Sequence, residues 1–410
     1  MIWKLFIYLF LCISLVAQPK VKTGIEVLRD NNFKMLEGKR IGLITNPTGV
    51  DSKLSSTIDI LFNATNVRLT ALFGPEHGVR GNIEGGESIE TYVDEKTNLQ
   101  VYSLYGKTRK PTQEMLKDID ALVYDIQDIG CRSYTFISTM GLAMEAAAEN
   151  NIEFIVLDRP NPLGGNRIEG GITENEFTSF ISQFPIPYVY GLTAGELAIF
   201  LNEEGLLGNK LKCNLTVVPM EGWERDMSFE NTGLQWIPTS PHIPHNFSAY
   251  YYVASGIVGE LRNSVSIGVG YTLPFQLFGT NWIDADKLSD KLNSYNLNGV
   301  YFRPINYIPY YSTGKGENLK GVQIHILDFQ SVELMKIQFY FLQAVYELYP
   351  EKDLFEMATS GQVHAFDLAL GSNKIREKFI QSHQVKDIVD LLNAGVAEFI
   401  ARSKKYFLYQ

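Results

Sequence analysis

The segment ALFGPEHGVRG, residues 71–81, places Glu76, His77 and Arg80 close together directly after an apolar run. Three glycines and a proline surround these side chains, which indicates a loop rather than a helix. A carboxylic acid next to an imidazole can exchange protons with a ligand when both are aimed into a cleft. The segment therefore indicates acid–base chemistry at the end of a strand.

Three further apolar runs also end in polar side chains. A single aspartate in such a position is usually a helix cap or a loop carboxylate. The carboxyl ends of parallel strands, however, meet at one edge of a sheet, where ligands bind. Four strand ends that carry polar groups therefore predict a polar cleft. The side chains that follow the other three runs are Asn46, Asp125, Asp128, Asp158 and Arg159.

The elements that must position these groups form an alternating series. Apolar runs rich in β-branched residues are separated by amphipathic patterns, which is typical of a parallel sheet covered by helices on both faces. We therefore expect an α/β fold with a Rossmann-like parallel sheet over residues 22–235. The expected strands are 40–47, 67–74, 99–106, 120–128, 152–160 and 213–220, and the expected helices are 55–66, 112–119, 136–151 and 193–205.

Composition and charge narrow the function further. A length of 410 residues suggests two domains, and 45% apolar with 20% charged residues is normal for a globular protein. A net charge of −10 argues against general affinity for nucleic acid or anionic membrane surfaces. The sequence has no G-x-x-x-x-G-K-[ST] segment and no G-x-G-x-x-G segment between the first strand and its helix. We therefore expect no nucleotide cofactor.

Residues 1–18 have the layout of a secretory signal peptide, with an early lysine and an apolar run from Leu5 to Ala17. This run is shorter than the roughly 20 residues needed to span a bilayer, although a retained anchor is the alternative. We expect cleavage near Gln18, a periplasmic or secreted protein, and no membrane span after cleavage. Cys131 and Cys213 then remain and could form one disulfide. They match no zinc motif, and no metal is expected.

The amino-acid composition of the chain changes after about residue 235. The segments 236–252, 266–279 and 303–321 are rich in glycine, proline and aromatic residues. Such loops on a rigid scaffold commonly bind ligands. Aromatic rings would suit a glycan because a pyranose presents an apolar C–H face, although packing at a domain interface is the simpler interpretation of any single tyrosine. We expect residues 236–410 to form a smaller α/β domain.

Five segments carry a resemblance to a known family. In order and spacing they are similar to the exo-β-N-acetylmuramidase family of peptidoglycan-degrading glycoside hydrolases, over roughly residues 24–410. The resemblance implies a site in the cleft between the Rossmann-like domain and the smaller domain. It also implies release of N-acetylmuramic acid from the non-reducing end of peptidoglycan fragments, without a nucleotide or metal. The segments are GLITNPTGV, LFGPEHGVRG, YDIQDIGCRSYTFISTM, VLDRPNPLGG and GLTAGELAIFLN.

The resemblance gives the strand-end acids specific roles. Cleavage of a glycosidic bond usually requires two carboxyl groups, one to protonate the leaving oxygen and one to activate water or attack the anomeric carbon. Glu76, in the match to the family's Pro-Glu-His-Gly motif, is the expected acid, and His77 is expected to orient it or hold the substrate. Asp125 and Asp128 are the candidates for the second carboxylate or for contacts with sugar hydroxyls.

Further residues are expected to bind the substrate. One of Arg80, Arg132 and Arg159 is a candidate partner for the lactyl carboxylate that distinguishes muramic acid from glucosamine, although neutralising the nearby acids is an equal alternative. The remaining candidates for contacts with the glycan are Asn46, Asp158, Tyr190 and His242.

Three positions depart from the pattern of the family. Tyr190 stands where most members have a histidine, and His242 stands where many have an asparagine. Residues 259–272 lack the Glu-Gly-Arg-Gly-Thr run common in other members. These positions belong to loops that can shape the sugar pocket, so the departures concern glycan specificity rather than the catalytic acid.

Three other functions stay compatible with the sequence. Two α/β domains around a cleft also describe a periplasmic glycan-binding protein, although a binder rarely concentrates carboxylates for a neutral or anionic ligand. An inactive relative that only binds cell-wall fragments is the second alternative. The third is a metal-dependent hydrolase, although no H-E-x-x-H segment supports it. Its ligands would come from Glu76, His77, Asp125, Asp128 and His242.

Overall fold

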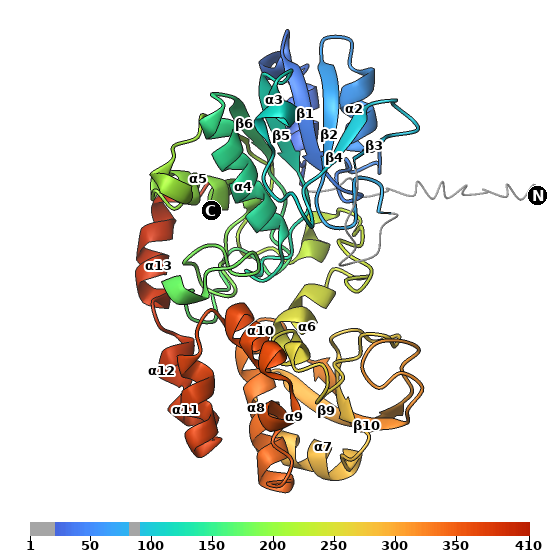
Figure 1. The fold of residues 1–410 in the computed structure, drawn as a ribbon, viewed down its shortest axis with the longest axis vertical. Helices are drawn as coiled ribbons and strands as arrows, with labels where there is room; N and C mark the ends of the chain where they lie inside the picture. The colour runs from blue at the N-terminus through green and yellow to red at the C-terminus, as the bar shows by residue number, and fades with distance from the viewer. Residues whose placement is uncertain (1–20, 82–90) are drawn as a thin grey trace, which may run out of the picture.

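A seven-stranded sheet forms the centre of the first domain in the computed structural model, which describes residues 21–81 and 91–410. The strand order is β3-β4-β2-β1-β5-β6-β7, and all neighbours pair in parallel except the short edge strand β3. Figure 1 shows this sheet in the upper part of the molecule. The strands are β1 (Arg40–Thr45), β2 (Arg68–Gly74), β3 (Tyr92–Val93), β4 (Gln100–Ser103), β5 (Ala121–Asp125), β6 (Glu153–Leu157) and β7 (Leu215–Val218).

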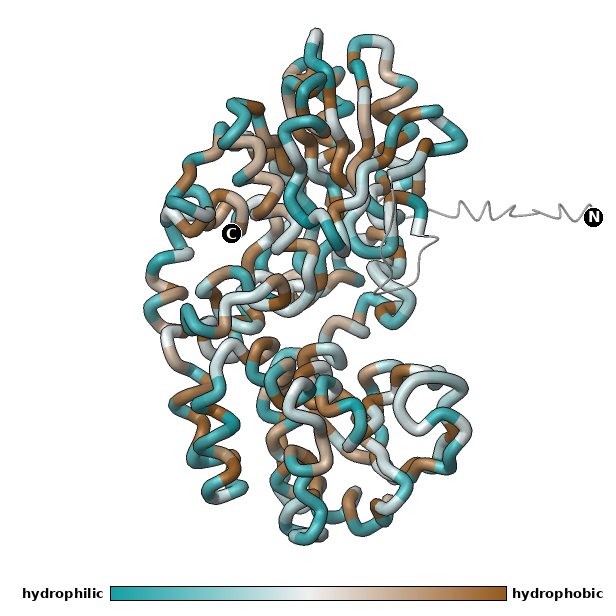
Figure 2. The backbone as a smooth tube through the Cα atoms, viewed as in Figure 1, coloured by the Kyte–Doolittle hydropathy of each residue, from teal (hydrophilic) through white to brown (hydrophobic). Residues whose placement is uncertain are grey.

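Helices cover both faces of this sheet, which explains why its strands are continuously apolar. On β5, Ala121 and Val123 pack in the cluster that contains α1 and α2, whereas Leu122 and Tyr124 pack in the cluster that contains α3, α4 and α5. The hydrophobic colour of the central strands in Figure 2 reflects this burial on both sides. The helices are α1 (Gly24–Asp30), α2 (Thr57–Asn63), α3 (Gln113–Leu116), α4 (Phe136–Glu149) and α5 (Ala194–Glu203).

The second domain contains a three-stranded antiparallel sheet in the order β8-β10-β9. Its core joins the sheet to the helices, and the rings of Phe278 on β8 and Phe341 on α8 stack with centroids 4.1 Å apart. Part of the expected loop 303–321 belongs to strands. Pro304 is accommodated because β9 is an edge strand, where one side needs no ladder hydrogen bonds. The elements are α6 (Ser248–Ser255), β8 (Leu277–Thr280), α7 (Ala285–Ser294), β9 (Val300–Tyr307), β10 (Leu319–Ile326) and α8 (Leu334–Leu348).

The C-terminal segment of the chain packs against the first domain. Phe399 on α13 meets Phe200 on α5 edge-on at 5.2 Å, and the phenol of Tyr409 donates to Asp158 at 2.6 Å. Figure 1 shows α13 rising from the lower domain toward α5. The helices after α8 are α9 (Leu354–Met357), α10 (Ser360–Leu370), α11 (Lys374–Ser382), α12 (Val389–Leu392) and α13 (Val396–Ser403).

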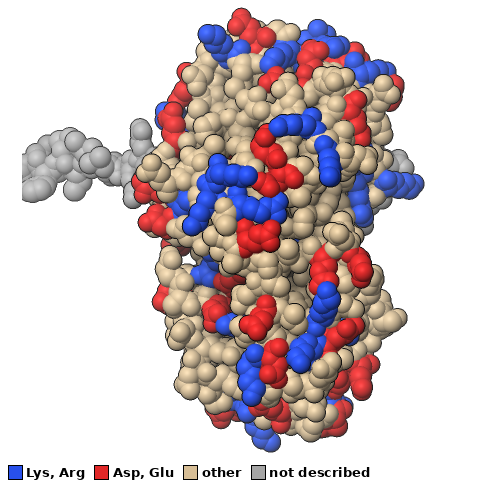
Figure 3. Space-filling view, turned by 90° about the vertical axis from the view of Figure 1, so that its left-hand side faces the viewer, with Lys and Arg blue, Asp and Glu red and all other residues tan. Residues whose placement is uncertain are grey.

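The predicted fold class is confirmed: a Rossmann-like parallel sheet is followed by a smaller α/β domain. Each strand and helix expected in the first domain is present, whereas α1 and β3 were not expected. Cys131 and Cys213 are both buried and free, so they do not form the disulfide that the sequence allowed. The expected signal peptide, residues 1–18, lies outside the described residues. On the face in Figure 3, positive and negative side chains are interspersed over both domains.

Candidate active site

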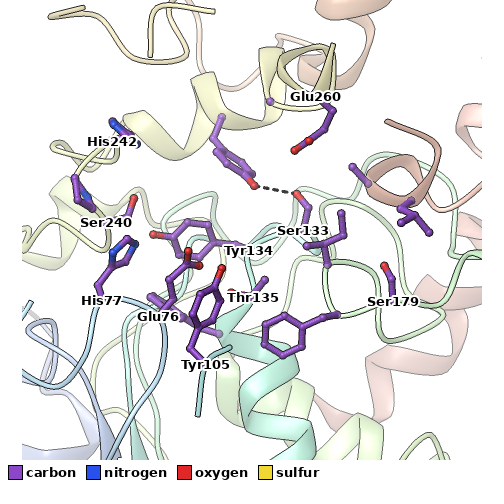
Figure 4. A pocket seen from close by; sticks show the side chains of 18 of the residues that line it. Glu76, His77, Tyr105, Ser133, Tyr134, Thr135, Ser179, Ser240, His242 and Glu260 are labelled. Carbon is purple, nitrogen blue, oxygen red and sulfur yellow. Dashed lines mark hydrogen bonds between the residues drawn. The ribbon is translucent and has the colours of Figure 1, made fainter. Parts of the chain in front are cut away.

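A cavity of about 1030 Å³ lies between the two domains. Its first-domain wall comes from loops that follow β2 and β4 and from the start of α4. Its second-domain wall comes from α6, the short helix Val258–Glu260 and the loop after β9. Figure 4 shows these side chains converging on one space. The polar and aromatic lining residues are Glu76, His77, Tyr105, Arg109, Ser133, Tyr134, Thr135, Phe136, Ser179, Phe180, Tyr188, Ser240, His242, Tyr252, Glu260 and Tyr311.

A tight turn after β2 aims Glu76 into this cavity. The backbone N–H of Gly78 donates to the carbonyl of Pro75 at 3.0 Å, and both His77 and Gly78 have positive φ angles, 73° and 71°. A non-glycine residue in the left-handed region costs of the order of 1 kcal/mol, and such strain is often found at functional sites. The predicted loop at the end of this strand is therefore present, and it brings Glu76 and His77 to the cavity.

Tyr105 lies beside Glu76 in the cavity. Burial, together with the negative charge of the nearby Glu76, raises the pKa of the Tyr105 phenol to about 12. The phenol therefore stays protonated and can serve as a donor beside the Glu76 carboxyl group. In Figure 4 the oxygens of Glu76, Tyr105 and Tyr134 point toward one another. Tyr134 is itself fixed by a hydrogen bond of 2.7 Å to Thr239.

Two histidines, His77 and His242, also line the cavity. His242 lies 2.8 Å, through its Nε2 atom, from the hydroxyl of Tyr311. Burial lowers the pKa of His242, and the nearby charge of His77 lowers it further. Both imidazoles therefore offer polar contacts at the mouth of the site, and His242 does so as a neutral ring. Both histidines therefore lie where they can contact a ligand, as we predicted from the sequence.

Glu260 supplies a second carboxyl group in the cavity. It belongs to the second domain and lies across the cavity from Glu76 in Figure 4. The guanidinium of Arg262 donates to Glu260 Oε2 at 3.2 Å. Glu260 carries no signal in the sequence that would predict this position, because it lies in the short helix Val258–Glu260 and does not follow an apolar strand.

The predicted candidate Asp125 is not in the cavity. Its carboxylate is completely buried and accepts hydrogen bonds from Thr57 and from Arg159, whose Nη2 atom is 2.9 Å away. The Arg159 guanidinium also donates to the carbonyl of Val50 at 2.9 Å. Asp125 and Arg159 therefore form an internal ion pair that holds the ends of β1, β5 and β6 together. This corrects their expected contact with substrate.

Asp128 is likewise buried away from the cavity. The phenol of Tyr190 and the backbone N–H of Gly130, at 2.7 Å, both donate to its Oδ2 atom. Burial raises the pKa of Asp128 to about 6, although these two hydrogen bonds oppose the rise. The expected roles of Asp128 in catalysis and of Tyr190 in substrate binding do not match this arrangement, because the two side chains are hydrogen-bonded to each other inside the first domain and neither lines the cavity.

Asp158 and Asn46 also serve the loops around them. Asp158 accepts hydrogen bonds from Thr193 at 2.7 Å and from the N–H of Gly195 at 2.8 Å, and so holds the start of α5. Burial raises its pKa to about 6. The Oδ1 atom of Asn46 accepts from the N–H of Thr48 at 3.0 Å. Neither side chain lines the cavity, so neither is placed to contact the glycan as expected.

The other two arginine candidates, Arg80 and Arg132, bind protein groups outside the cavity. Arg80 forms a two-point ion pair with Asp94, at 2.9 and 3.0 Å, which lowers the pKa of that carboxyl to about 2. Arg132 is fully buried and donates to carbonyls of both domains, including Gly171 and Leu370 at 2.8 Å each. The expected pairing of Arg80, Arg132 or Arg159 with a substrate carboxylate is therefore replaced by structural roles for all three.

No three His, Cys, Asp or Glu side chains within residues 21–81 and 91–410 converge into a group that could hold a metal ion. The five residues considered as ligands are divided between the cavity and the buried interior. The same part of the chain has no helix with the length and apolar character required to cross a bilayer.

Comparison with known proteins identifies the family. A family model described as exo-beta-N-acetylmuramidase NamZ, N-terminal, matches residues 41–246, and its C-terminal counterpart matches residues 250–409. The peptidoglycan beta-N-acetylmuramidase NamZ of Bacillus subtilis is 45% identical over 392 residues, which cover 96% of this chain and 92% of that protein. The chain belongs to the exo-β-N-acetylmuramidase NamZ family.

Two solved structures of DUF1343 family proteins from Bacteroides fragilis share the fold. One is 59% identical with a TM-score of 0.92, and covers 96% of this chain and 100% of its own. The other is 28% identical with a TM-score of 0.74, and the corresponding coverages are 95% and 99%. The likeness extends over both domains of the NamZ architecture, so the cavity between them lies within the matched region.

The departures from the NamZ pattern occupy different environments. His242 lines the cavity, and residues 259–272 begin with the segment that carries Glu260. Tyr190 is buried against Asp128 instead. Of the three departures, two can therefore influence the glycan directly, whereas Tyr190 acts within the first domain.

Sequence reasoning missed Tyr105, Arg109, Tyr134 and Glu260. Tyr105 and Arg109 follow β4, which lies next to β2 in the sheet, so their strand end delivers them to the same edge as Glu76. That signal was available in the apolar run before Tyr105. Tyr134 lies in a loop and Glu260 in a single short turn of helix, and neither segment has a periodic apolar pattern. Only the packing of the two domains brings the two residues to the same cavity.

Proposed function

We propose that the protein is an exo-acting glycoside hydrolase that releases N-acetylmuramic acid from the non-reducing end of peptidoglycan fragments, with Glu76 as its general acid. Membership of the NamZ family and the name of the Bacillus subtilis relative support the reaction. The observation that carries the residue assignment is the position of Glu76, which is aimed into the interdomain cavity beside a phenol that stays protonated.

The two carboxyl groups of the cavity have different roles in the reaction, and each comes from a different domain. Glu76 protonates the glycosidic oxygen as the bond to the anomeric carbon breaks, so that the aglycone leaves as a neutral alcohol. Glu260 is the carboxylate on the other side of the cavity, where it stabilises the positively charged sugar and either attacks the anomeric carbon or activates water. Asp125 and Asp128 have no part in these steps, because both are bound internally.

The lining suits a sugar ring. Aromatic side chains offer faces for the C–H surface of a pyranose, and hydroxyl and imidazole groups offer hydrogen bonds to its substituents. A volume of about 1030 Å³ is at the upper end of the range of ligand pockets, so the cavity has space for more than one small substituent around the ring.

We place the protein in the periplasm or outside the cell. The support is the signal-peptide pattern of residues 1–18, with its apolar run from Leu5 to Ala17. The test is to fractionate cells that express the full chain with a C-terminal tag and to sequence the N-terminus of the product. A mature end near Gln18 in the periplasmic or external fraction is expected, and an intact chain in the cytoplasm would contradict the assignment.

The direct test of function compares two disaccharides that contain the same two sugars in opposite order. Wild-type protein is incubated with MurNAc-β-1,4-GlcNAc and with GlcNAc-β-1,4-MurNAc, and products are identified by mass spectrometry. Release of N-acetylmuramic acid from the first alone is expected. Cleavage of the second alone would reassign the pocket to glucosamine, and binding of either without cleavage would favour the glycan-binding alternative.

A further inference from the structure

The cavity contains one strongly basic side chain, and none of the predicted arginines supplies it. Among the described residues that line the cavity, Arg109 is the only lysine or arginine. It follows β4 in the loop that also positions Tyr105, and its positive charge lowers the pKa of the Tyr105 phenol while burial and Glu76 raise it. Arg109 therefore lies close to the phenol that contacts Glu76.

Arg109 is held over an aromatic ring. Its guanidinium carbon is 4.3 Å from the centroid of Phe180, which also lines the cavity. When the face of a guanidinium lies over an aromatic ring, its N–H groups point outward from its edge. They therefore remain available to bind a planar anion. The ring thus restricts the orientation of Arg109 without occupying its donors.

Arg109 forms no ion pair with any Asp or Glu of residues 21–81 and 91–410. In contrast, the neighbouring Lys110 is engaged by Glu145 at 3.2 Å and Glu149 at 2.7 Å. Of the two carboxyl groups in the cavity, Glu260 is the one that acts as a carboxylate, and its negative charge repels an anionic ligand. A negatively charged substrate therefore requires a cation in the same cavity, and Arg109 is the available one.

We infer that Arg109, stacked on Phe180, binds the lactyl carboxylate of N-acetylmuramic acid and thereby selects muraminides over glucosaminides. This inference rests on the proposed function, because the lactyl group is the substituent that distinguishes the two sugars. A charge-assisted pair between a guanidinium and a carboxylate contributes enough to change kcat/KM by about 10- to 100-fold. Since Arg109 is exposed, the lower part of that range is expected.

The test compares two enzymes on two substrates. The enzymes are wild type and Arg109→Gln, and the substrates are 4-nitrophenyl β-N-acetylmuraminide and the same compound with its lactyl carboxylate converted to a carboxamide. Wild type is expected to prefer the carboxylate about 10-fold or more in kcat/KM. Arg109→Gln is expected to lose that preference, with a larger loss of kcat/KM on the carboxylate than on the carboxamide.

Lys107→Gln is the matched control, because Lys107 is an exposed cation of the same loop that does not line the cavity. It is expected to keep the wild-type preference. Equal losses on both substrates in Arg109→Gln, or a wild type that does not distinguish them, would overturn the role of Arg109 while leaving the hydrolase in place. A wild type that cleaves no muraminide at all would instead overturn the proposed function, and the inference with it.

Discussion

Glu76 of the first domain and Glu260 of the second line the same cavity and approach it from opposite walls. The site is therefore complete only when the two domains are packed together. Arg132 contributes to that packing, since its buried guanidinium donates to Gly171 in the first domain and to Leu370 at the end of α10. Glu76 and Glu260 thus line the site, whereas Arg132 helps to hold together the two domains that carry them.

Glu260→Gln is expected to reduce kcat about 100- to 10,000-fold, because the neutral amide can neither attack the anomeric carbon nor activate water. The loss should be similar for the 4-nitrophenyl muraminide and for the MurNAc–GlcNAc disaccharide, since this role does not depend on the leaving group. Glu351→Gln changes an exposed glutamate of the same domain and should be neutral. Wild-type turnover by Glu260→Gln would remove Glu260 from the mechanism.

Tyr105→Phe is expected to lower kcat about 10-fold with KM within about twofold of wild type. The variant keeps the ring that lines the cavity but loses the protonated hydroxyl beside Glu76, so a donor to the acid is missing in the transition state. Steady-state kinetics on the disaccharide measure both constants. Tyr310→Phe, at an exposed tyrosine, is the control. A change in KM alone would show that the Tyr105 hydroxyl binds substrate instead of positioning Glu76.

Arg132→Met is expected to reduce the free energy of unfolding by about 3–5 kcal/mol, because several buried carbonyls lose their donor. Urea denaturation measures the loss. Arg262→Met removes an exposed arginine and should change stability by no more than about 0.5 kcal/mol. The KM of the folded Arg132→Met enzyme for muraminide should be unchanged. A large increase in KM without loss of stability would restore the predicted substrate contact.

The buried Asp128 predicts a specific pH dependence of stability. Its pKa is about 6 in the folded protein, against 3.8 for the ordinary group. Below about pH 4 both states hold the proton, whereas between pH 4 and 6 the folded state alone holds it. The folded state then binds more protons, so the free energy of unfolding falls as pH rises through this window, by up to about 3 kcal/mol.

Asp128→Asn tests this by removing the titration while keeping an acceptor oxygen for Tyr190. Urea midpoints at pH 4, 5, 6 and 7 should fall less steeply for the variant than for wild type. A residual slope is expected, because burial also raises the pKa of Asp158 to about 6. Parallel curves for the two proteins would show that Asp128 does not titrate in this range.

The sequence predicts the sheet and the edge at which polar groups gather, because continuous apolar strands and helix caps are local signals. It does not predict which of those groups are satisfied internally. Asp125 is engaged by Thr57, and Asp158 by Thr193 and Tyr409, and these partners lie far away in sequence. Strand-end position alone therefore selected several residues of which only the Glu76–His77 pair reaches the cavity.

The second-domain wall of the cavity could not be predicted from the sequence, and the reason is different. Glu260 lies in a short turn of helix whose neighbours have no alternating or helical apolar pattern, and its function depends on the packing of one domain against the other. Arg109 follows a strand that was predicted correctly, but a loop arginine is usually a solvated surface residue. Only the location of Phe180 beneath it reveals that it belongs to the cavity.

The most direct test of the central claim is the effect of Glu76→Gln on two leaving groups, with Glu95→Gln as an exposed control in the same domain. Turnover of the MurNAc–GlcNAc disaccharide should fall about 100- to 10,000-fold, because a sugar alkoxide leaves only when it is protonated. Turnover of 4-nitrophenyl β-N-acetylmuraminide should fall at least 10-fold less, because nitrophenolate leaves without a proton. Wild-type cleavage of the disaccharide by Glu76→Gln, or equal losses on both substrates, would contradict the assignment of Glu76 as the general acid.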